Sequence, residues 1–289
     1  MGQREMDKTE VVELIKDFIR LSPENALQNE AGDKAWEEPL VGFSSGSDPI
    51  YGEFKNHIGP FYWTPLDLFL QTFPETNVSA GDLTVISWVL PHITATKEDN
   101  RRETRFPAER WARGRGAGEK ANAQLRKHLI ATLQSRGYQA LAPDLSPFKR
   151  NGVSERYGRS SSWSERHAAY ASGLGTFGLC DGLITPVGKA VRCGSVIAQI
   201  ALPPTERPYQ DHHAYCLYYA QGACGKCVDR CPVQAISKER GHDKEKCSQF
   251  LNGVTVDYIK NNFGFDSHAC GLCQTGVPCE SRIPRKSAS

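Results

Sequence analysis

The cysteines of this chain are concentrated in one short stretch, and that placement limits its fold more than any other feature. The sequence has 289 residues and 10 cysteines, of which eight fall between Cys216 and Cys279. Clustered cysteines predict either a disulfide framework or metal and redox chemistry. The N-terminus has no apolar core typical of an export signal, so we expect a cytoplasmic protein whose thiols stay reduced. A metal or redox centre is therefore the prediction.

The spacing within this stretch is typical of a bacterial ferredoxin. The run from Cys224 to Pro232 reads C-x2-C-x3-C-P, and Cys216 stands upstream as a displaced first ligand. The last cysteine of a ferredoxin run binds the other cluster, so we predict two 4Fe–4S clusters with crossed ligands. The first is assigned Cys216, Cys224, Cys227 and Cys279, and the second is assigned Cys231, Cys247, Cys270 and Cys273.

A pair of zinc sites is the alternative reading of the same cysteines. Two C-x2-C pairs are also typical of four-cysteine zinc sites. Zinc ribbons do not require a C-x3-C-P run, and eight ligands divide evenly between two cubane clusters. These two points favour iron–sulfur chemistry.

Upstream of the cysteines, helical and strand patterns are mixed, which predicts an α+β fold. Helices are expected at residues 7–20, 117–136 and 163–173. Strands are expected at residues 83–90, 138–142, 182–185 and 192–202. Residues 22–60 are expected to be mostly loop, and residues 143–162 are expected to be a polar loop. The pattern breaks at Pro203, so we predict an α/β cofactor and substrate domain at 1–203 and a two-cluster ferredoxin-like domain at 204–289.

Three segments resemble a known family. Residues 165–178 are similar to the E-R-x-A-A…G-L-G-W-x-G segment of the epoxyqueuosine reductases, and residues 110–115 are similar to their R-Y-A-R-G-R stretch. Residues 224–236 resemble the ferredoxin insert of that family. Together with the related reductive dehalogenases, the family implies a nitroreductase-like domain that holds cobalamin beside two 4Fe–4S clusters. Cobalamin enters the prediction only through this resemblance.

The resemblance also implies which residues touch the cofactor. The arginine-rich stretch 101–116 reads either as an anion clamp or as a solvated helix face. The glycines near residue 175 either let the backbone approach a corrin or flavin, or simply end a helix. Cys180 follows them and is a candidate reactive thiol, whereas Cys193 reads as a core residue. The cofactor contacts predicted in this way are Arg113, Gly173, Gly175 and Thr176.

The sequence differs from the family at the position of the family's general acid. Counted back from Glu165, the position of the catalytic aspartate falls on Arg159, which cannot release a proton near neutral pH. Tyr157 is then the nearest candidate proton donor, and His167 is the next. Neither residue need be catalytic: Tyr157 could be an ordinary loop tyrosine and His167 a structural histidine.

The chain ends ten residues after Cys279, without room for the helical-repeat tail that helps the family hold tRNA, so tRNA is not the expected substrate.

These features predict an iron–sulfur oxidoreductase that passes electrons from two clusters to a cobalamin-type cofactor and reduces a small molecule. A low-potential ferredoxin or flavodoxin is the expected electron donor. No membrane association is expected, because no run reaches the roughly 18 apolar residues of a membrane span. Two alternatives stay open: an electron-transfer or redox-sensing protein without a corrinoid, and a true epoxyqueuosine reductase that acts on tRNA.

Overall fold

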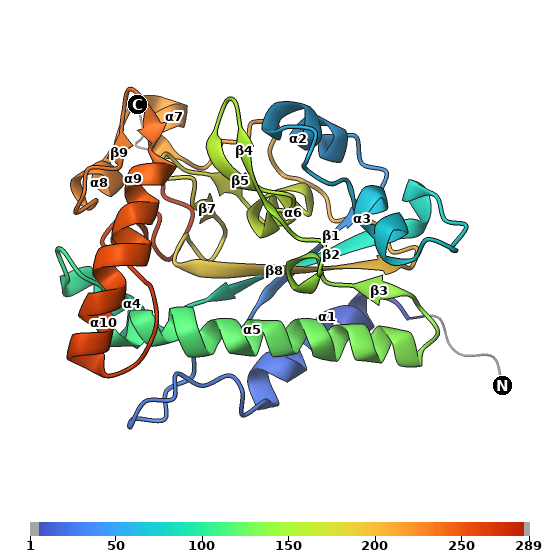
Figure 1. Cartoon of the computed structure of the whole chain (residues 1–289), viewed down its shortest axis with the longest axis horizontal. Coiled ribbons are helices and arrows are strands. Elements are labelled where there is room, and N and C mark those ends of the chain that lie inside the picture. Colours follow the sequence, from blue (N-terminus) through green and yellow to red (C-terminus); the bar gives the residue numbers. More distant parts are fainter. Residues whose placement is uncertain (1–5, 286–289) are drawn as a thin grey trace.

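A four-stranded antiparallel sheet lies at the centre of the computed structural model, which describes residues 6–285 (Figure 1). Most of the N-terminal segment that was searched for an export signal falls outside those residues. The strands lie in the order β1-β2-β8-β3. Their bounds are Leu40–Ser45 for β1, Leu83–Pro91 for β2, Val191–Gln199 for β8 and Ala140–Leu141 for β3.

Strand β2 is the interior of this sheet. All nine of its residues are buried, and it pairs with β8 along its whole length and with β1 on its other edge. A strand whose two faces both meet packed layers can be apolar throughout, without polar alternation. The strand expected at 83–90 is therefore confirmed.

Helices cover both faces of the sheet. One face carries α1 (Lys8–Leu21) and the long α5 (Glu109–Ser135), which run below the sheet in Figure 1. The other face carries α2 (Ile50–Ile58), α3 (Pro65–Thr72) and α6 (Glu165–Ala171). Both layers are mainly apolar, so the sheet is the middle of a three-layer arrangement of mixed helix and sheet.

Several predicted elements are confirmed with shifted ends. Helix α1 begins after Asp7, whose carboxylate accepts a hydrogen bond from the backbone N–H of Glu10 at 2.9 Å. Helix α5 begins eight residues before the expected start at 117, in a glycine-rich stretch. Those glycines serve close packing, because a Cβ at Gly114 would lie 2.7 Å from His92 and one at Gly118 would lie 2.7 Å from Trp36.

Two segments expected to be loops contain regular structure: residues 22–60 are mostly loop, as predicted, but the loop predicted at 143–162 was wrong. Residues 22–60 include β1 and α2, and residues 143–162 include a hairpin of β4 (Asn151–Ser154) and β5 (Gly158–Ser161). Tertiary pairing overrides weak local propensity in each case. The hydroxyl of Ser44 on β1, for example, is buried and hydrogen-bonded to Tyr51 at 2.7 Å.

The cysteine-rich region lies beside one end of the sheet and of α5 (Figure 1). The short strands β6 (Thr176–Phe177) and β7 (Leu183–Ile184) lie beside it, with Ile184 packed among its cysteines, and helix α4 (Thr94–Arg102) packs at the same end. Its own elements are α7 (Leu217–Gln221), α8 (Lys226–Asp229), β9 (Ile236–Ser237), β10 (Gly241–His242), α9 (Lys244–Gln249) and α10 (Thr255–Phe263). No helix in the described residues combines the length and apolar character needed to cross a bilayer.

A buried ionic network fixes α5 to the sheet and to α6. The guanidinium of Arg126, which is 1% exposed, lies 3.3 Å from a carboxylate oxygen of Glu119, 3.5 Å from Glu165 and 3.7 Å from Asp144. Burial raises the pKa of Glu165 to about 7, although the positive charge of Arg126 acts in the opposite direction. One buried guanidinium therefore lies within 4 Å of three carboxylates.

We expect Arg126→Met to lower the free energy of unfolding by about 3–5 kcal/mol, because it leaves Glu165 without its cation, whereas Glu119 and Asp144 keep Arg192 and Lys149. Arg136→Met is the matched control, since Arg136 pairs with Glu10 at the surface and such pairs contribute at most about 1 kcal/mol. Urea denaturation of the two variants measures the difference. Equal losses in both would contradict the role given to the network.

Candidate functional site

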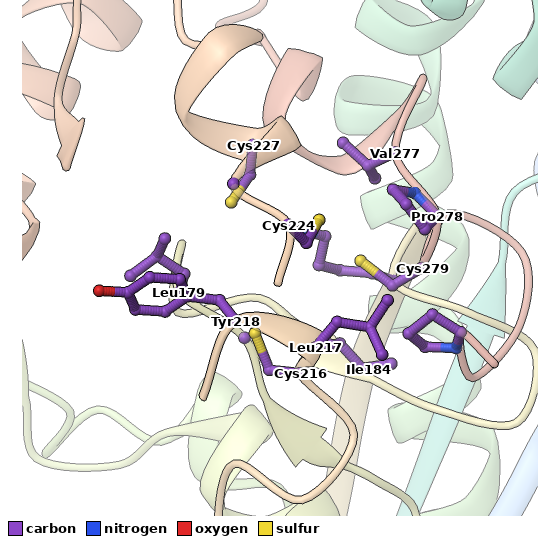
Figure 2. A pocket seen from close by; sticks show the side chains of 14 residues that line it. Leu179, Ile184, Cys216, Leu217, Tyr218, Cys224, Cys227, Val277, Pro278 and Cys279 are labelled. Atoms are coloured by element: carbon purple, nitrogen blue, oxygen red, sulfur yellow. The ribbon is translucent and has the colours of Figure 1, made fainter. Parts of the chain in front are cut away.

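Four of the predicted ligands line one pocket, in the combination assigned to the first cluster (Figure 2). They come from separate parts of the chain: one precedes α7, one lies in the turn after it, one is in α8 and one is in the C-terminal loop. Figure 2 shows their sulfur atoms facing a common space, with Leu179, Ile184 and Val277 on the surrounding wall. The four are Cys216, Cys224, Cys227 and Cys279.

A sharp turn brings two of these thiols to the same side of the chain. Cys224 has a φ of 86° and Gly225 a φ of 146°, values that reverse the backbone just before α8. The carbonyl of Gly225 then accepts a hydrogen bond from the N–H of Val228 at 2.7 Å, which starts the helix that carries Cys227. Glycine suits this position because of its φ and because a Cβ would lie 2.6 Å from Lys238.

The other four predicted ligands lie in the second half of the region. The sulfur of Cys231 accepts a hydrogen bond from the N–H of Ala235 at 3.1 Å, and Cys247 is in α9. Burial, with Cys247 and Cys231 nearby, raises the pKa of Cys270 to about 11. Cys273 follows Cys270 after one tight turn.

The turn of the second C-x2-C pair rests directly on the long helix of the sheet layer. Gly271 has a φ of 68°, and a Cβ at this position would lie 2.0 Å from the indole of Trp111 on α5. No side chain fits there. The second pair is thus positioned by contact with α5 and not by its own loop alone.

The grouping of the cysteines bears on which metal they suit. Within residues 6–285, no three His, Cys, Asp or Glu side chains stand close enough to hold one metal ion. Zinc binds cysteine sulfur at about 2.3 Å, so four zinc ligands must crowd around a single point. The thiolates of a 4Fe–4S cluster bind separate irons and therefore stand farther apart. The first pocket is edged by four thiols among apolar side chains, and four thiolates are the donor set of a 4Fe–4S cluster.

One charged residue of the first pocket was missed by the sequence analysis. Lys189 is 2% exposed, lines the pocket and donates a hydrogen bond from Nζ to the sulfur of Cys180 at 3.1 Å. Burial alone lowers the pKa of Lys189, but the surrounding thiols, first among them Cys180, outweigh it and raise the pKa well above its ordinary value. In the sequence, Lys189 is marked only by its position between two apolar segments that were predicted to be strands.

The three predicted catalytic residues lie on two elements, Tyr157 and Arg159 in the β4–β5 hairpin and His167 in α6. Tyr157 lies at the tip of the β4–β5 hairpin and is 42% exposed, and Arg159 pairs with Glu245 of α9 at 3.7 Å. His167 lies among aromatic rings, including those of Phe54 and Phe177. Its removal from water lowers the pKa of His167 to about 3, so the ring is neutral at physiological pH.

The residues predicted to touch a corrin or flavin are occupied by contacts within the protein. A Cβ at Gly173 would lie 2.6 Å from the carbonyl oxygen of Glu206, and one at Gly175 would lie 2.3 Å from that of Ile184. The hydroxyl of Thr176 accepts a hydrogen bond from the N–H of Tyr215 at 2.9 Å.

Arg113, the remaining predicted contact, is likewise engaged. It pairs with Glu109 at 2.7 Å and donates to the carbonyl of Gln28 at 2.7 Å.

Comparisons with known proteins support a relationship over part of the chain. The chain matches no family model. It is 31% identical over 119 residues to the epoxyqueuosine reductase of Bacillus cereus, a match that covers 40% of this chain and 29% of that protein. The chain therefore spans less than a third of the length of this curated relative.

Solved structures extend the likeness to nearly the whole chain. The epoxyqueuosine reductase of Streptococcus thermophilus matches with a TM-score of 0.52 and 12% identity, covering 98% of this chain and 69% of that one. A reductive dehalogenase, whose structure suggests a mechanism for B12-dependent dehalogenation, matches with a TM-score of 0.51 and 17% identity, covering 86% and 30%. At these identities the match concerns the fold alone. Over these 119 residues the chain is similar in sequence to the epoxyqueuosine reductases, and its mixed helix and sheet fold is similar to theirs and to that of reductive dehalogenases.

Proposed function

We propose that this protein is an iron–sulfur reductase whose cysteine-rich region holds two 4Fe–4S clusters beside the sheet-bearing part of the chain. The observation that carries the proposal is the shared pocket of four cysteines that lie up to 63 residues apart in the sequence. Convergence of distant thiols on one space is difficult to explain by packing alone. The names of the curated relatives, all of them reductases, support the same class of activity.

In this proposal each half of the region has its own ligand set. The first cluster is held by Cys216, Cys224, Cys227 and Cys279, and the second by Cys231, Cys247, Cys270 and Cys273. A 4Fe–4S cluster, when bound, supplies one-electron redox chemistry. The polypeptide excludes water from the first site with Leu179 and Ile184 and leaves Cys224 exposed to solvent. The exposed edge suits an external donor such as a reduced ferredoxin or flavodoxin.

The position of the first pocket indicates where electrons leave. Its wall includes Gly178, Leu179 and Ile184, which belong to the β6–β7 segment. That segment follows directly on the glycine motif near residue 175. An electron acceptor of the larger part of the chain would therefore lie on this side of the first cluster.

A corrinoid is our candidate for that acceptor, on the strength of the fold shared with a reductive dehalogenase described as B12-dependent. The residues expected to touch it are packed against the protein itself, so no reaction step is derived through it. An electron-transfer or redox-sensing role without a corrinoid is the second candidate. The packing of Gly173, Gly175 and Thr176 against other parts of the chain favours this role.

For the substrate we propose a small molecule and not tRNA. The residue at the position of the family's acid, Arg159, is a cation paired at the surface with Glu245, so it suits an anionic group better than proton transfer. Tyr157 is the proposed proton donor, since its side chain is accessible at the hairpin tip. His167, neutral and enclosed by rings, is a weaker candidate.

Anaerobically purified protein should contain about eight irons per chain, the content of two 4Fe–4S clusters. Cys227→Ser and Cys273→Ser should each lose about half of this iron and destabilise the region, because cluster binding is coupled to folding. Cys193→Ala, a change in the core strand β8, is the control and should keep all of it. Iron and zinc analysis decides the question: stoichiometric zinc without iron would overturn the proposal.

Titration of the iron-loaded protein with cobalamin tests whether a corrinoid is the electron acceptor. If a corrinoid is the acceptor, the cobalamin spectrum should change on binding, with a dissociation constant of about 1 μM or lower, equivalent to about −8 kcal/mol. Flavin is titrated in parallel. No response to cobalamin together with retention of flavin would replace the corrinoid by a flavin, and no response to either would favour the electron-transfer role.

Tyr157→Phe should lower turnover by about 10²-fold or more, the usual scale for loss of a general acid, while iron content stays unchanged. Tyr138→Phe is the matched control, because Tyr138 hydrogen-bonds to the N–H of Met6 beside the opposite face of the sheet. Oxidation of reduced methyl viologen, followed with a panel of organohalides and epoxides, gives the assay. Unchanged turnover in the Tyr157 variant would remove this residue from the mechanism.

A further inference from the structure

A single buried lysine stands where the sheet meets the cysteine-rich region. Lys189 follows a tight turn in which Thr185 and Gly188 exchange backbone hydrogen bonds of 3.1 and 2.8 Å. Gly188 has a φ of 89°, and a Cβ there would lie 2.1 Å from the carbonyl oxygen of Glu280. The N–H of Lys189 donates to the carbonyl of Cys279 at 2.8 Å. The backbone on which this lysine sits is therefore fixed against the loop of a predicted ligand.

The ammonium of Lys189 has sulfur, and not carboxylate, as its partner. It donates to the sulfur of Cys180 at 3.1 Å, and the pocket that it lines contains four predicted ligands but no Asp or Glu. Burying an ammonium costs several kcal/mol unless opposite charge compensates it. Compensation by carboxylates is absent from this lining, so the negative charge must come from thiolates or from what they bind.

Cys180 links this cation to the second set of ligands. Its side chain is 5% exposed, and its sulfur lies 4.0 Å from the backbone carbonyl oxygen of Cys273. Cys273 belongs to the second predicted set, whereas the pocket lined by Lys189 belongs to the first. The Lys189–Cys180 pair thus stands between the two sets without being assigned to either.

We propose that Lys189 is a positioning residue for electrons: its fixed positive charge, hydrogen-bonded to Cys180, raises the reduction potential of the first cluster and, to a smaller extent, that of the second. This inference rests on the proposed presence of the clusters. Reduction adds one electron from the external donor to a cluster, and no bond forms or breaks. A nearby cation stabilises the added negative charge, most strongly where water is excluded.

The arrangement gives the two clusters unequal environments. Lys189 lines the first pocket and its N–H is bonded to the carbonyl of Cys279, whereas its hydrogen bond toward the second set goes to Cys180, whose sulfur lies 4.0 Å from the carbonyl oxygen of Cys273. The first cluster would then be the better electron acceptor of the two. Because that cluster adjoins the β6–β7 segment, electrons would collect on the side that faces the larger part of the chain.

Redox titration of the iron-loaded protein with dithionite, followed by electron paramagnetic resonance, tests the inference. Lys189→Met should lower the equilibrium constant for reduction of the first cluster at least tenfold, which is a downward shift of about 59 mV for a one-electron couple. Lys189→Arg keeps the charge and should stay within a factor of about three of wild type. Lys55→Met removes an equal charge from α2, where Lys55 pairs with Asp67, and should change neither potential.

The outcomes separate this inference from the proposed function. Wild-type protein without iron would refute the clusters themselves, whereas iron-loaded Lys189→Met with unchanged potentials would refute only the role of Lys189. If Lys189→Met loses iron, Lys189→Arg decides: retained iron and potential mean that the charge is required, and loss of iron in both variants means that the lysine is only a packing element. Equal shifts in the Met and Arg variants would also overturn the inference.

Discussion

Backbone hydrogen bonds between the turn before β8 and the C-terminal loop fasten the cysteine-rich region to the central sheet. The N–H of Lys189 bonds to the carbonyl of Cys279, and the N–H of Ala190 bonds to that of Glu280 at 3.0 Å. Strand β8 begins one residue later and pairs with β2 along nine positions. The last predicted ligand in the sequence is thereby held by the most buried part of the fold. The junction holds Cys279 in the first pocket together with the ion pair between the neighbouring Glu280 and Arg101 of α4.

Charged hydrogen bonds complete the attachment from the side of α4. Arg230, which directly precedes Cys231, donates to the carbonyls of Glu103 and Asn100 and also to those of Leu272 and Thr275. One guanidinium thus ties the first cysteine run, the second run and the α4 end of the sheet layer together. Bonds from a charged donor are stronger than neutral ones, and a rigid fork holds several acceptors at once. For a protein proposed to pass electrons between fixed centres, such rigidity keeps the distances between them constant.

The fold was predictable from the sequence where burial and local pattern agree. The apolar run of β2 and the periodic, capped α1 have their own signals, so both were found. Strand β1 and the β4–β5 hairpin were missed, because β1 is held by pairing with β2 and by buried serine hydrogen bonds, and the hairpin strands are short and polar. Glycines were a misleading signal within α5, since they mark close contacts with His92 and Trp36 and not a helix boundary.

The sequence by itself determined the candidate ligands, because two or three residues between thiols are a local property that a single turn converts into neighbouring sulfur atoms. It also determined the mixed helix and sheet class through the period of its apolar residues. Only the tertiary structure decided that Gly271 must lie against Trp111, and that a buried lysine lines the pocket of Cys216 and Cys279. It also filled the space around Gly173 and Gly175 with the chain's own backbone. Contacts between residues tens of positions apart depend on how layers pack, and no local spacing encodes that packing.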